Sequence, residues 1–597
     1  MLKAREEVNE KHKWDIEAMY QSLDSWEADF AQVQMQKDEV KALQGTLGSS
    51  AESLYKVLSL KDELSMKAEN VYVFAHLKHD EDTANPEYQA LSARADHLIT
   101  EVYALISFIE PEILGVDKAK LDSYIASYEP LSTYKHYIDE IVRLREHTLS
   151  DEMENVLAKV SEIGQAASKI FEMLNNADLK FGTIIDENGN EKELTHGSYL
   201  SFMESQNRDV RKAAFLALYK AYIEHKNTLA ESYAASVRND VFFASQRKYK
   251  SCLEASLTPS NIPTSVYHNL IESVNAHLPS LHKYMEIRKK ALGLSELHMY
   301  DIYVPLITEA NNDIGYDKAC ERVIKSLAPM GDEYVGALKA GLDSRWIDIY
   351  ENKGKKSGAY SWGSYLSHPY ILLNYDNKVN DMFTLTHEIG HSMQSYLSRQ
   401  NQPYVYGSYT LFVAEVASTV NEALLMEYLL NTEKDEFMKK HLINYYIEQF
   451  RGTVFRQTMF AEFELKTHEM AEAGEALTSQ VMNKMYRELN EKYFGKNVIL
   501  DEEIDYEWSR IPHFYRPFYV YQYATGYAAA IALSKKILGG NVDGYLQFLK
   551  SGSSMYPIDQ LKVAGVDMGE PEAVNMALET FGKLVDELGE ILGGQNR

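Results

Sequence analysis

The chain has 597 residues, of which 45% are hydrophobic and 25% charged, a balance typical of a globular protein and not of a disordered or collagen-like chain. Its 61 basic and 88 acidic residues give a formal net charge of −27. Because an acidic surface repels phosphate backbones and anionic lipids, we expect neither nucleic acid nor a membrane as a partner.

The beginning of the chain has no feature of an export signal. Residues 1–20 lack an apolar core and carry acidic side chains, and no run of about 18 apolar residues occurs anywhere. The two cysteines, Cys252 and Cys320, are too few for the paired disulfides of a secreted protein of this size. We therefore expect a cytoplasmic protein with two reduced thiols.

Most of the chain is predicted to be helical, because proline is scarce and helix-forming residues dominate. In one region apolar residues recur at alternating steps of three and four, which predicts a single helix with an apolar stripe packed in the core. The residues of this stripe are Met153, Val156, Val160, Ile163, Ala167, Ile170 and Leu174.

Extended structure is predicted in two places only. Leu179–Asp186 is rich in strand-forming residues and is followed by turn residues and a short second arm, which indicates a small hairpin. Ser357–Tyr375 combines glycine, aromatic and β-branched residues and is the second candidate. The hairpin is also the best boundary between an N-terminal helical region, residues 1–198, and a larger region, residues 199–597.

Residues 387–391 read His-Glu-Ile-Gly-His. Positions i and i+4 lie on one face of a helix, so His387 and His391 can bind a single Zn²⁺, while Glu388 can reach a water at the metal and act as a general base. The pattern also arises by chance, and two unrelated histidines on a helix are the alternative.

A second helix is predicted at residues 412–422. Its small residues, which let two helices approach closely, are Ala414, Ala417 and Ser418. Glu415, Thr419 and Glu422 share one face and need partners if they are buried. We expect Glu415 to be the third metal ligand and Glu422 to orient a ligand imidazole. Acids on a solvated face are the alternative.

The segment 510–527 is rich in tyrosine and contains His513. Hydrolysis of an amide creates an oxyanion, which O–H or N–H donors stabilise. His513 and Tyr523 are the candidate donors, with Tyr519 as the reserve, although packed aromatic residues are the commoner case. Arg510 or Arg516 is a candidate for holding a substrate carboxylate.

Together these motifs resemble the thimet-oligopeptidase-like zinc peptidases, and within them the bacterial oligoendopeptidase F group. Three further segments share the likeness: residues 13–16 near the start, the run from Leu292 to Pro305, and the run from His513 to Gly526. The likeness therefore spans nearly the whole chain.

The resemblance implies a mainly α fold, a bowl of helices with a deep channel and one zinc ion at its floor. It implies His387, His391 and Glu415 as metal ligands and Glu388 as the general base. It also implies His513 and a nearby tyrosine as oxyanion donors. The family's two tyrosines stand three residues apart, whereas this run offers spacings of two and four, so the choice of tyrosine stays open.

The expected substrates are short, unstructured peptides, hydrolysed internally by residues 199–597. A peptide would lie extended beside Gly358, Ala359 and Tyr360 and add a strand to an exposed edge. The turn at Gly407 would form part of the cleft wall, and Arg516 would hold a carboxylate. Nothing in the sequence indicates an oligomeric state.

Other functions fit the same residues. A zinc aminopeptidase would need an acidic group for the free amine of its substrate, and no dedicated motif is found. A zinc carboxypeptidase or dipeptidase-type exopeptidase of the same fold fits the same metal site. A non-catalytic helical peptide-binding protein is a different class, against which Glu388 argues because a structural metal needs no general base.

Overall fold

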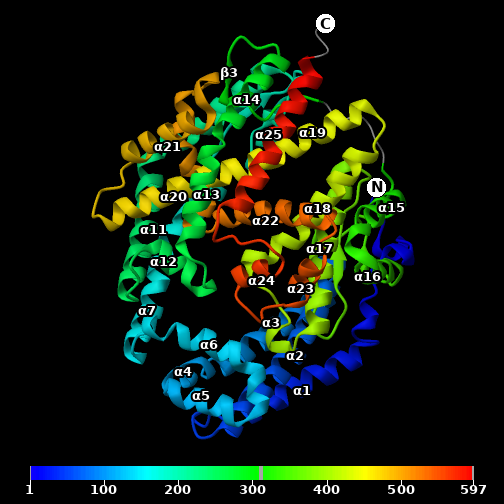
Figure 1. Cartoon of the computed structure of the whole chain (residues 1–597), viewed down its shortest axis with the longest axis vertical. Coiled ribbons are helices and arrows are strands. Elements are labelled where there is room, and N and C mark those ends of the chain that lie inside the picture. The colour runs from blue at the N-terminus through cyan, green and yellow to red at the C-terminus, as the bar shows by residue number, and fades with distance from the viewer. Residues whose placement is uncertain (1, 308–313, 594–597) are drawn as a thin grey trace. The chain divides into compact units, whose positions relative to one another are not determined.

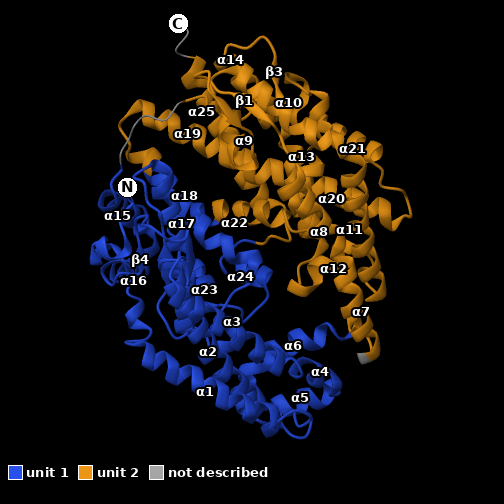
Figure 2. Ribbon diagram, turned by 180° about the vertical axis from the view of Figure 1, so that it is seen from behind, with its two compact units in different colours: residues 1–145, 311–428, 533–566 blue, residues 146–310, 429–532, 567–597 orange. Residues whose placement is uncertain are grey.

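The computed structural model describes residues 2–307 and 314–593, and these are mainly helical with a few short strands, as predicted. The chain forms two compact units built from alternating segments (Figure 2). Unit 1 comprises residues 1–145, 311–428 and 533–566, and unit 2 comprises residues 146–310, 429–532 and 567–597. The division of the chain at residue 198 stays a prediction.

Unit 1 contains a group of N-terminal helices, a small sheet and the helices that follow the sheet (Figure 1). Its helices are α1 (Leu23–Lys41), α2 (Ala51–Glu81), α3 (Pro86–Ile106), α4 (Ile109–Gly115), α5 (Lys118–Ser127), α6 (Lys135–Arg143), α15 (Tyr316–Ser326), α16 (Gly331–Asp343), α17 (Val379–Asn401), most of α18 (Leu411–Thr432), α23 (Asp543–Lys550) and α24 (Pro557–Val563).

Local sequence explains where the first helices begin. Ser22 and Ser50 cap α1 and α2 by accepting backbone N–H groups of the first turn, and Asn85 caps α3, which has proline at its first position. Helices α1, α2 and α3 pack side by side around a core that includes Trp14 and Trp26.

The sheet of unit 1 has the strand order β4 (Ile347–Asp348), β6 (Tyr370–Leu372), β5 (Tyr360–Trp362). Strand β4 pairs with β6 in parallel, and β5 pairs with β6 antiparallel. The extended structure predicted within residues 357–375 is thus confirmed. Among the described residues β5 has a strand partner on one side only, and α17 follows immediately after the sheet.

The Lys13–Ile16 segment is held to this sheet by buried polar contacts. The Trp14 indole donates to Glu81 Oε1 at 2.9 Å, and Arg5 pairs with both Glu81 and Asp348. Lys355 pairs with Asp348 at 2.7 Å, and both side chains are almost fully buried. Buried charges are stable only when paired, so this motif of the family resemblance serves the fold of unit 1.

Unit 2 is built from helices and two two-stranded sheets. Its helices are α7 (Asp151–Gly164), α8 (Ala166–Met173), α9 (His196–Met203), α10 (Arg208–Glu224), α11 (Lys226–Gln246), α12 (Cys252–Leu257), α13 (Thr264–Ala276), α14 (Leu278–Ala291), α19 (Glu436–Phe450), α20 (Arg456–Glu472), α21 (Ser479–Phe494), the first part of α22 (Tyr521–Leu538) and α25 (Glu572–Gly593).

The predicted hairpin is present: β1 (Thr183–Ile185) pairs antiparallel with β2 (Glu191–Glu193). The second sheet of unit 2 pairs β3 (Leu297–His298) with β7 (Val498–Ile499) in parallel. Next to β3, the buried Asp301 carboxylate pairs with Arg208 at 2.8 Å and with Arg211 at 2.7 Å. The Leu292–Pro305 motif therefore stabilises the fold of unit 2.

The predicted core helix at residues 153–174 is wrong in two respects. The chain forms two helices, α7 and α8, instead of one. Most of the predicted stripe is exposed, whereas the buried side chains are Leu157, Ala167 and Phe171. The apolar residues of this segment fall on more than one helix face, and their spacing alone predicted the wrong face to be buried. Exposed members of the stripe are Met153, Val156, Ile163 and Ile170.

Among the described residues, none of the helices combines the length and the apolar character that crossing a membrane requires.

Candidate active site

The candidate site of unit 1 is formed where α17 and α18 cross. A Cβ atom on Gly390 would lie 2.5 Å from the Cα of Ser418 and 2.7 Å from the carbonyl oxygen of Ala417, so only glycine permits this approach. Ala417 and Ser418 are the small residues that the sequence placed on the facing helix. This contact brings the side chains at 387, 391 and 415 to one place.

Three side chains converge there, with ligand atoms that all lie within 4.8 Å of one another. His387 Nε2 lies 3.2 Å from His391 Nε2, and Glu415 Oε2 lies 3.3 Å and 3.6 Å from the two nitrogens. Two imidazoles and one carboxylate are the donor set of a catalytic zinc site that keeps a coordination position open. The residues therefore fit a zinc ion, although their role as ligands stays a prediction.

Hydrogen bonds hold two of these side chains in place. His387 Nδ1 lies 2.6 Å from Glu422 Oε1, which leaves Nε2 directed at the cluster. Ser418 Oγ lies 3.2 Å from Glu415 Oε2 and donates to it. An acidic partner on the outer nitrogen of a metal-ligating imidazole sets its tautomer and orientation, which is the role predicted for Glu422.

The charges of the cluster shift its pKa values in opposite directions. Burial alone would lower the pKa of His387, but Glu415 and Glu422 outweigh it and raise this pKa to about 10. Hydrogen bonds from His387 and His391 lower the pKa of Glu415 well below its ordinary value. In contrast, burial raises the pKa of Glu388, which is 7% exposed. A raised carboxyl pKa suits a general base that must also release its proton.

The site lies on the open face of an otherwise buried helix. Between Met382 and Gln394, every residue of α17 is buried except Thr384, His387 and His391. The turn from Gly407 to Tyr409 was predicted to form part of the cleft wall, and the Tyr409 hydroxyl lies 3.0 Å from Ser395 Oγ of α17. Its role in a cleft stays a prediction.

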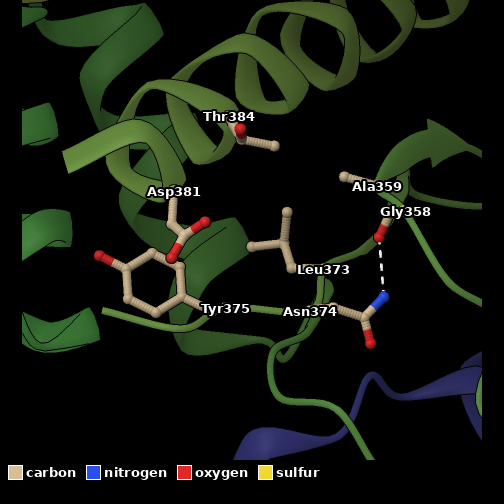
Figure 3. Close-up of a pocket in the computed structure, with 7 residues that line it drawn as sticks. All are labelled: Gly358, Ala359, Leu373, Asn374, Tyr375, Asp381 and Thr384. Atoms are coloured by element: carbon tan, nitrogen blue, oxygen red, sulfur yellow. Dashed lines mark hydrogen bonds between the residues drawn. The ribbon is translucent and has the colours of Figure 1, made fainter. Parts of the chain in front are cut away.

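A pocket of about 290 Å³ opens at the N-terminal end of the same face (Figure 3). Gly358 and Ala359, both predicted to bind substrate, line it from the segment before β5. The sequence analysis did not select the other lining residues, because their roles depend on the contact between the sheet and α17. They are Leu373, Asn374, Tyr375, Asp381 and Thr384.

The structure gives two further predicted substrate residues a part in the fold. The Tyr360 hydroxyl donates to Asp80 at 2.7 Å, its ring packs on the core of unit 1, and its backbone pairs with Leu372 of β6. A Cβ atom on Gly407 would lie 2.6 Å from the ring of Tyr365. Whether either residue binds substrate stays a prediction.

The donors predicted for the oxyanion belong to unit 2 and form an aromatic group. The His513 ring centroid lies 6.3 Å from that of Tyr519 and 6.1 Å from that of Tyr523, and the two tyrosine rings are 5.5 Å apart. Burial, followed by the charge of Arg516, lowers the pKa of His513. The lowered pKa favours the neutral imidazole, which can donate one N–H.

The backbone beside this group is strained. Phe518 has a φ of +55°, a left-handed conformation that a bulky residue adopts at a cost of roughly 1–2 kcal/mol. Its N–H donates to the buried Glu464 at 2.8 Å, which holds the conformation. This left-handed residue lies between His513 and Tyr519, whose rings both lie near that of Tyr523.

The two arginines of this segment differ. Arg510 pairs with the buried Glu507 at 2.8 Å and also donates to the Tyr219 hydroxyl, so it is engaged within the fold and is not available to a substrate. Arg516 is exposed and contributes positive charge near His513. Arg516 thus stays the candidate for a substrate carboxylate.

Comparison with known proteins agrees with this geometry. Residues 201–580 match the family model described as peptidase family M3, and residues 112–181 match the one described as oligopeptidase F. The chain is 48% identical to oligopeptidase PepF of Bacillus subtilis, over 99% of this chain and 89% of that protein.

Two solved structures extend the likeness. A Chlamydophila abortus structure is 37% identical, with a TM-score of 0.94, over 99% of this chain and 100% of the other. Oligoendopeptidase-F from Enterococcus faecium is 40% identical, with a TM-score of 0.73, over 96% and 99% of the two chains. The chain therefore belongs to peptidase family M3, in its oligoendopeptidase F group, and is a peptide-hydrolysing endopeptidase of the metallopeptidase class.

Proposed function

We propose that this enzyme is a zinc-dependent endopeptidase that hydrolyses short, unstructured peptides with Glu388 as the general base. The observation that carries the proposal is the convergence of His387 Nε2, His391 Nε2 and Glu415 Oε2 beside Glu388 on the open face of α17. A zinc ion held by these three side chains would act as a Lewis acid on the scissile carbonyl and lower the pKa of the attacking water.

Side chains of the protein would transfer the proton, orient the metal ligand and stabilise the oxyanion. Glu388 accepts a proton from the attacking water and passes it to the leaving amine, a transfer that its raised pKa favours. Glu422 holds His387 in the tautomer that leaves Nε2 free. His513 and Tyr523 donate hydrogen bonds to the oxyanion, with Tyr519 as the alternative donor.

The substrate would bind as an extended strand. The free side of β5 would offer the backbone groups of Ala359 and Ser361, which alternate with the residues paired to β6. The contact between Ser361 Oγ and Ser392 Oγ, 2.8 Å long, keeps this strand beside α17. Main-chain pairing holds a flexible peptide whatever its sequence, but a folded protein has no free strand to offer. Arg516 would bind the substrate's carboxylate. The two unbonded cysteines fit a reducing compartment such as the cytoplasm.

A quenched fluorescent peptide with both termini blocked tests the proposal. An endopeptidase cleaves it, whereas a carboxypeptidase or dipeptidase does not. We expect full loss of cleavage with a chelator and recovery when one equivalent of Zn²⁺ is returned. Undiminished cleavage by the metal-free protein would contradict the zinc site, and cleavage of only unblocked peptides would favour the exopeptidase.

A further inference from the structure

In the pocket at the N-terminal end of α17 (Figure 3), the side chains that can donate hydrogen bonds already donate them to backbone carbonyl groups of the protein. Asn374 Nδ2 donates to the carbonyl oxygens of Lys356, at 3.0 Å, and of Gly358, at 2.8 Å. The Tyr375 hydroxyl donates to a backbone carbonyl at 2.9 Å, and so does the Thr384 hydroxyl at 3.1 Å. A ligand group that needs hydrogen bonds from these side chains would find their protons in use.

Acceptors, in contrast, are available in the same pocket. Asp381 Oδ2 accepts the N–H groups of Asp376 and Lys378 at 2.9 and 3.0 Å, which uses about half of the lone-pair sites of a carboxylate. The Lys378 ammonium pairs with Asp376 at 2.6 Å. The Thr384 oxygen keeps its lone pairs. The pocket thus combines a negative charge, spare acceptors and the apolar walls of Leu373 and Tyr375.

Two residues that line the pocket, Asp381 and Thr384, stand on α17 just before the candidate metal ligands His387 and His391. Asp381, Thr384 and Glu388 follow one another at steps of three and four on α17, and Thr384 precedes Glu388 by four residues, about 6 Å of helix rise. Thr384 also precedes His387 by three residues, so both lie on the open face of α17 about one turn apart. Ala359 and Ser361 lie on one face of the strand, the face that contacts α17 through Ser392.

We propose that this pocket binds a lysine or arginine side chain of the peptide residue adjacent to the cleaved bond. The aliphatic stem packs on Leu373 and Tyr375, and the cationic head donates to Asp381 and Thr384. An aspartate or glutamate is rejected there, because it would meet a like charge and no free side-chain donor. The inference rests on the proposed function, since it specifies the substrate of that site.

The first experiment uses the zinc-loaded enzyme and three blocked, quenched peptides that differ only in the residue next to the cut, which is lysine, alanine or glutamate. Products are mapped by mass spectrometry. We expect kcat/KM for the lysine peptide to exceed that for the alanine peptide by roughly tenfold, the effect of one charge-assisted hydrogen bond, and the glutamate peptide to be the slowest.

The outcomes separate the two proposals. No cleavage of any peptide would refute the proposed function. The comparison is made with the varied residue placed on either side of the cleaved bond. If the alanine peptide is cleaved as fast as the lysine peptide or faster in both series, only the pocket assignment is overturned.

Substitutions of residues that line the pocket test whether the pocket is the source of this preference. Asp381→Asn should reduce the lysine-to-alanine ratio of kcat/KM roughly tenfold, whereas Asp376→Asn removes an equal charge from the same turn outside the pocket and should leave the ratio unchanged. Equal effects of both would overturn the inference. Because Asp381 also caps α17, Thr384→Lys provides a second variant, whose cation fills the pocket and should abolish the preference.

Binding gives a readout that does not depend on turnover. In a Glu388→Gln background the lysine peptide should bind about tenfold more tightly than the alanine peptide, and the difference should shrink as salt is added. Equal affinities at low salt would contradict the assignment.

Discussion

The two groups of candidate catalytic residues are built in different ways. In unit 1, His387, His391 and Glu415 project from two long helices that touch through Gly390, and their ligand atoms lie within 4.8 Å. In unit 2, His513 stands in a short 3-10 segment, Pro512–Tyr515, and its ring centroid lies about 6 Å from those of Tyr519 and Tyr523. The first group thus joins charged and hydrogen-bonding side chains, whereas the second is a group of aromatic rings.

The difference shows which chemistry each construction suits. Helix packing fixes the acid–histidine cluster before any ligand arrives, as a metal site requires. The second group depends on an anchor outside itself, because Glu507 pairs with Arg456 and Arg510 just before the His513 segment. Donors to a transient charge need only hydroxyl and imidazole protons, which aromatic side chains supply.

The largest effect is expected from Glu388→Gln, which separates metal binding from proton transfer within the first group. The variant should retain one zinc per chain and lose roughly 10²- to 10⁴-fold in kcat, because an amide cannot accept the proton of water. Metal analysis and peptide cleavage check this. Glu415→Gln is the contrasting variant and should lose zinc as well. Loss of zinc from Glu388→Gln would show that Glu388 helps to hold the metal, and would contradict its assignment as a general base alone.

Tyr523→Phe tests the second group. Removal of one oxyanion donor should reduce kcat roughly 10²- to 10³-fold with unchanged KM and an intact fold. Steady-state kinetics with the quenched peptide measures both constants. Tyr519→Phe is the matched control and should have a much smaller effect. If the two effects are reversed, Tyr519 is the donor, and if both rates are unchanged the group takes no part in the reaction.

Glu422→Gln asks how far the first group depends on its hydrogen-bonded support. Its 2.6 Å contact with His387 Nδ1 should make the variant bind zinc roughly 10- to 100-fold more weakly, while the zinc-saturated enzyme keeps most of its activity. Competition with a chromophoric chelator measures the affinity. Asp376→Asn, an exposed acid of the same unit, should leave it unchanged. Equal affinities in all three proteins would remove Glu422 from the site.

The smallest effect concerns the anchor of the second group. Burial alone would raise the pKa of Glu507, but Arg456 and Arg510 outweigh it and lower this pKa from 4.5 to about 2. A depressed carboxyl pKa stabilises the folded state above the unfolded value, and the contribution is lost as pH falls from about 4.5 to about 2.

Thermal unfolding followed by tryptophan fluorescence should therefore show acid destabilisation in this window; Trp508, one of the tryptophans, is buried next to Glu507 in the chain. Glu507→Gln should be less stable at pH 7 and should flatten the dependence, because glutamine has no proton to gain. An identical pH dependence in both proteins would exclude Glu507 as its source.

Sequence spacing predicted the parts of the site that depend on one helix or two adjacent ones. Residues four apart in an HExxH pattern must share a helix face, and small residues on the next helix predicted its close approach, which the contact between Gly390 and Ser418 confirms. The hairpin and the strands near Tyr360 were predicted for the same reason, since turn and strand signals are local.

Features that depend on distant contacts could not be predicted. Nothing in the residues around Asp381 or Asn374 shows that a sheet comes to lie beside α17 and forms a pocket with it. Arg510 has the pattern of a surface residue, but Glu507 and Tyr219 enclose it. The prediction of an apolar stripe at residues 153–174 was wrong for a related reason. Which face of a helix is buried depends on the elements that pack against it, and these are distant in sequence.

The late arrival of α23 has a consequence during synthesis on the ribosome. Ser398 of α17 donates to the carbonyl oxygen of Leu549 at 3.0 Å, and α23 covers the helix that carries the histidines. The nascent chain reaches residue 566 only 566 − 145 = 421 residues after it leaves the first segment of unit 1. At about 5–20 residues per second, this takes roughly 20–80 s. The packing around α17, which carries the candidate metal ligands, can therefore be completed only near the end of synthesis.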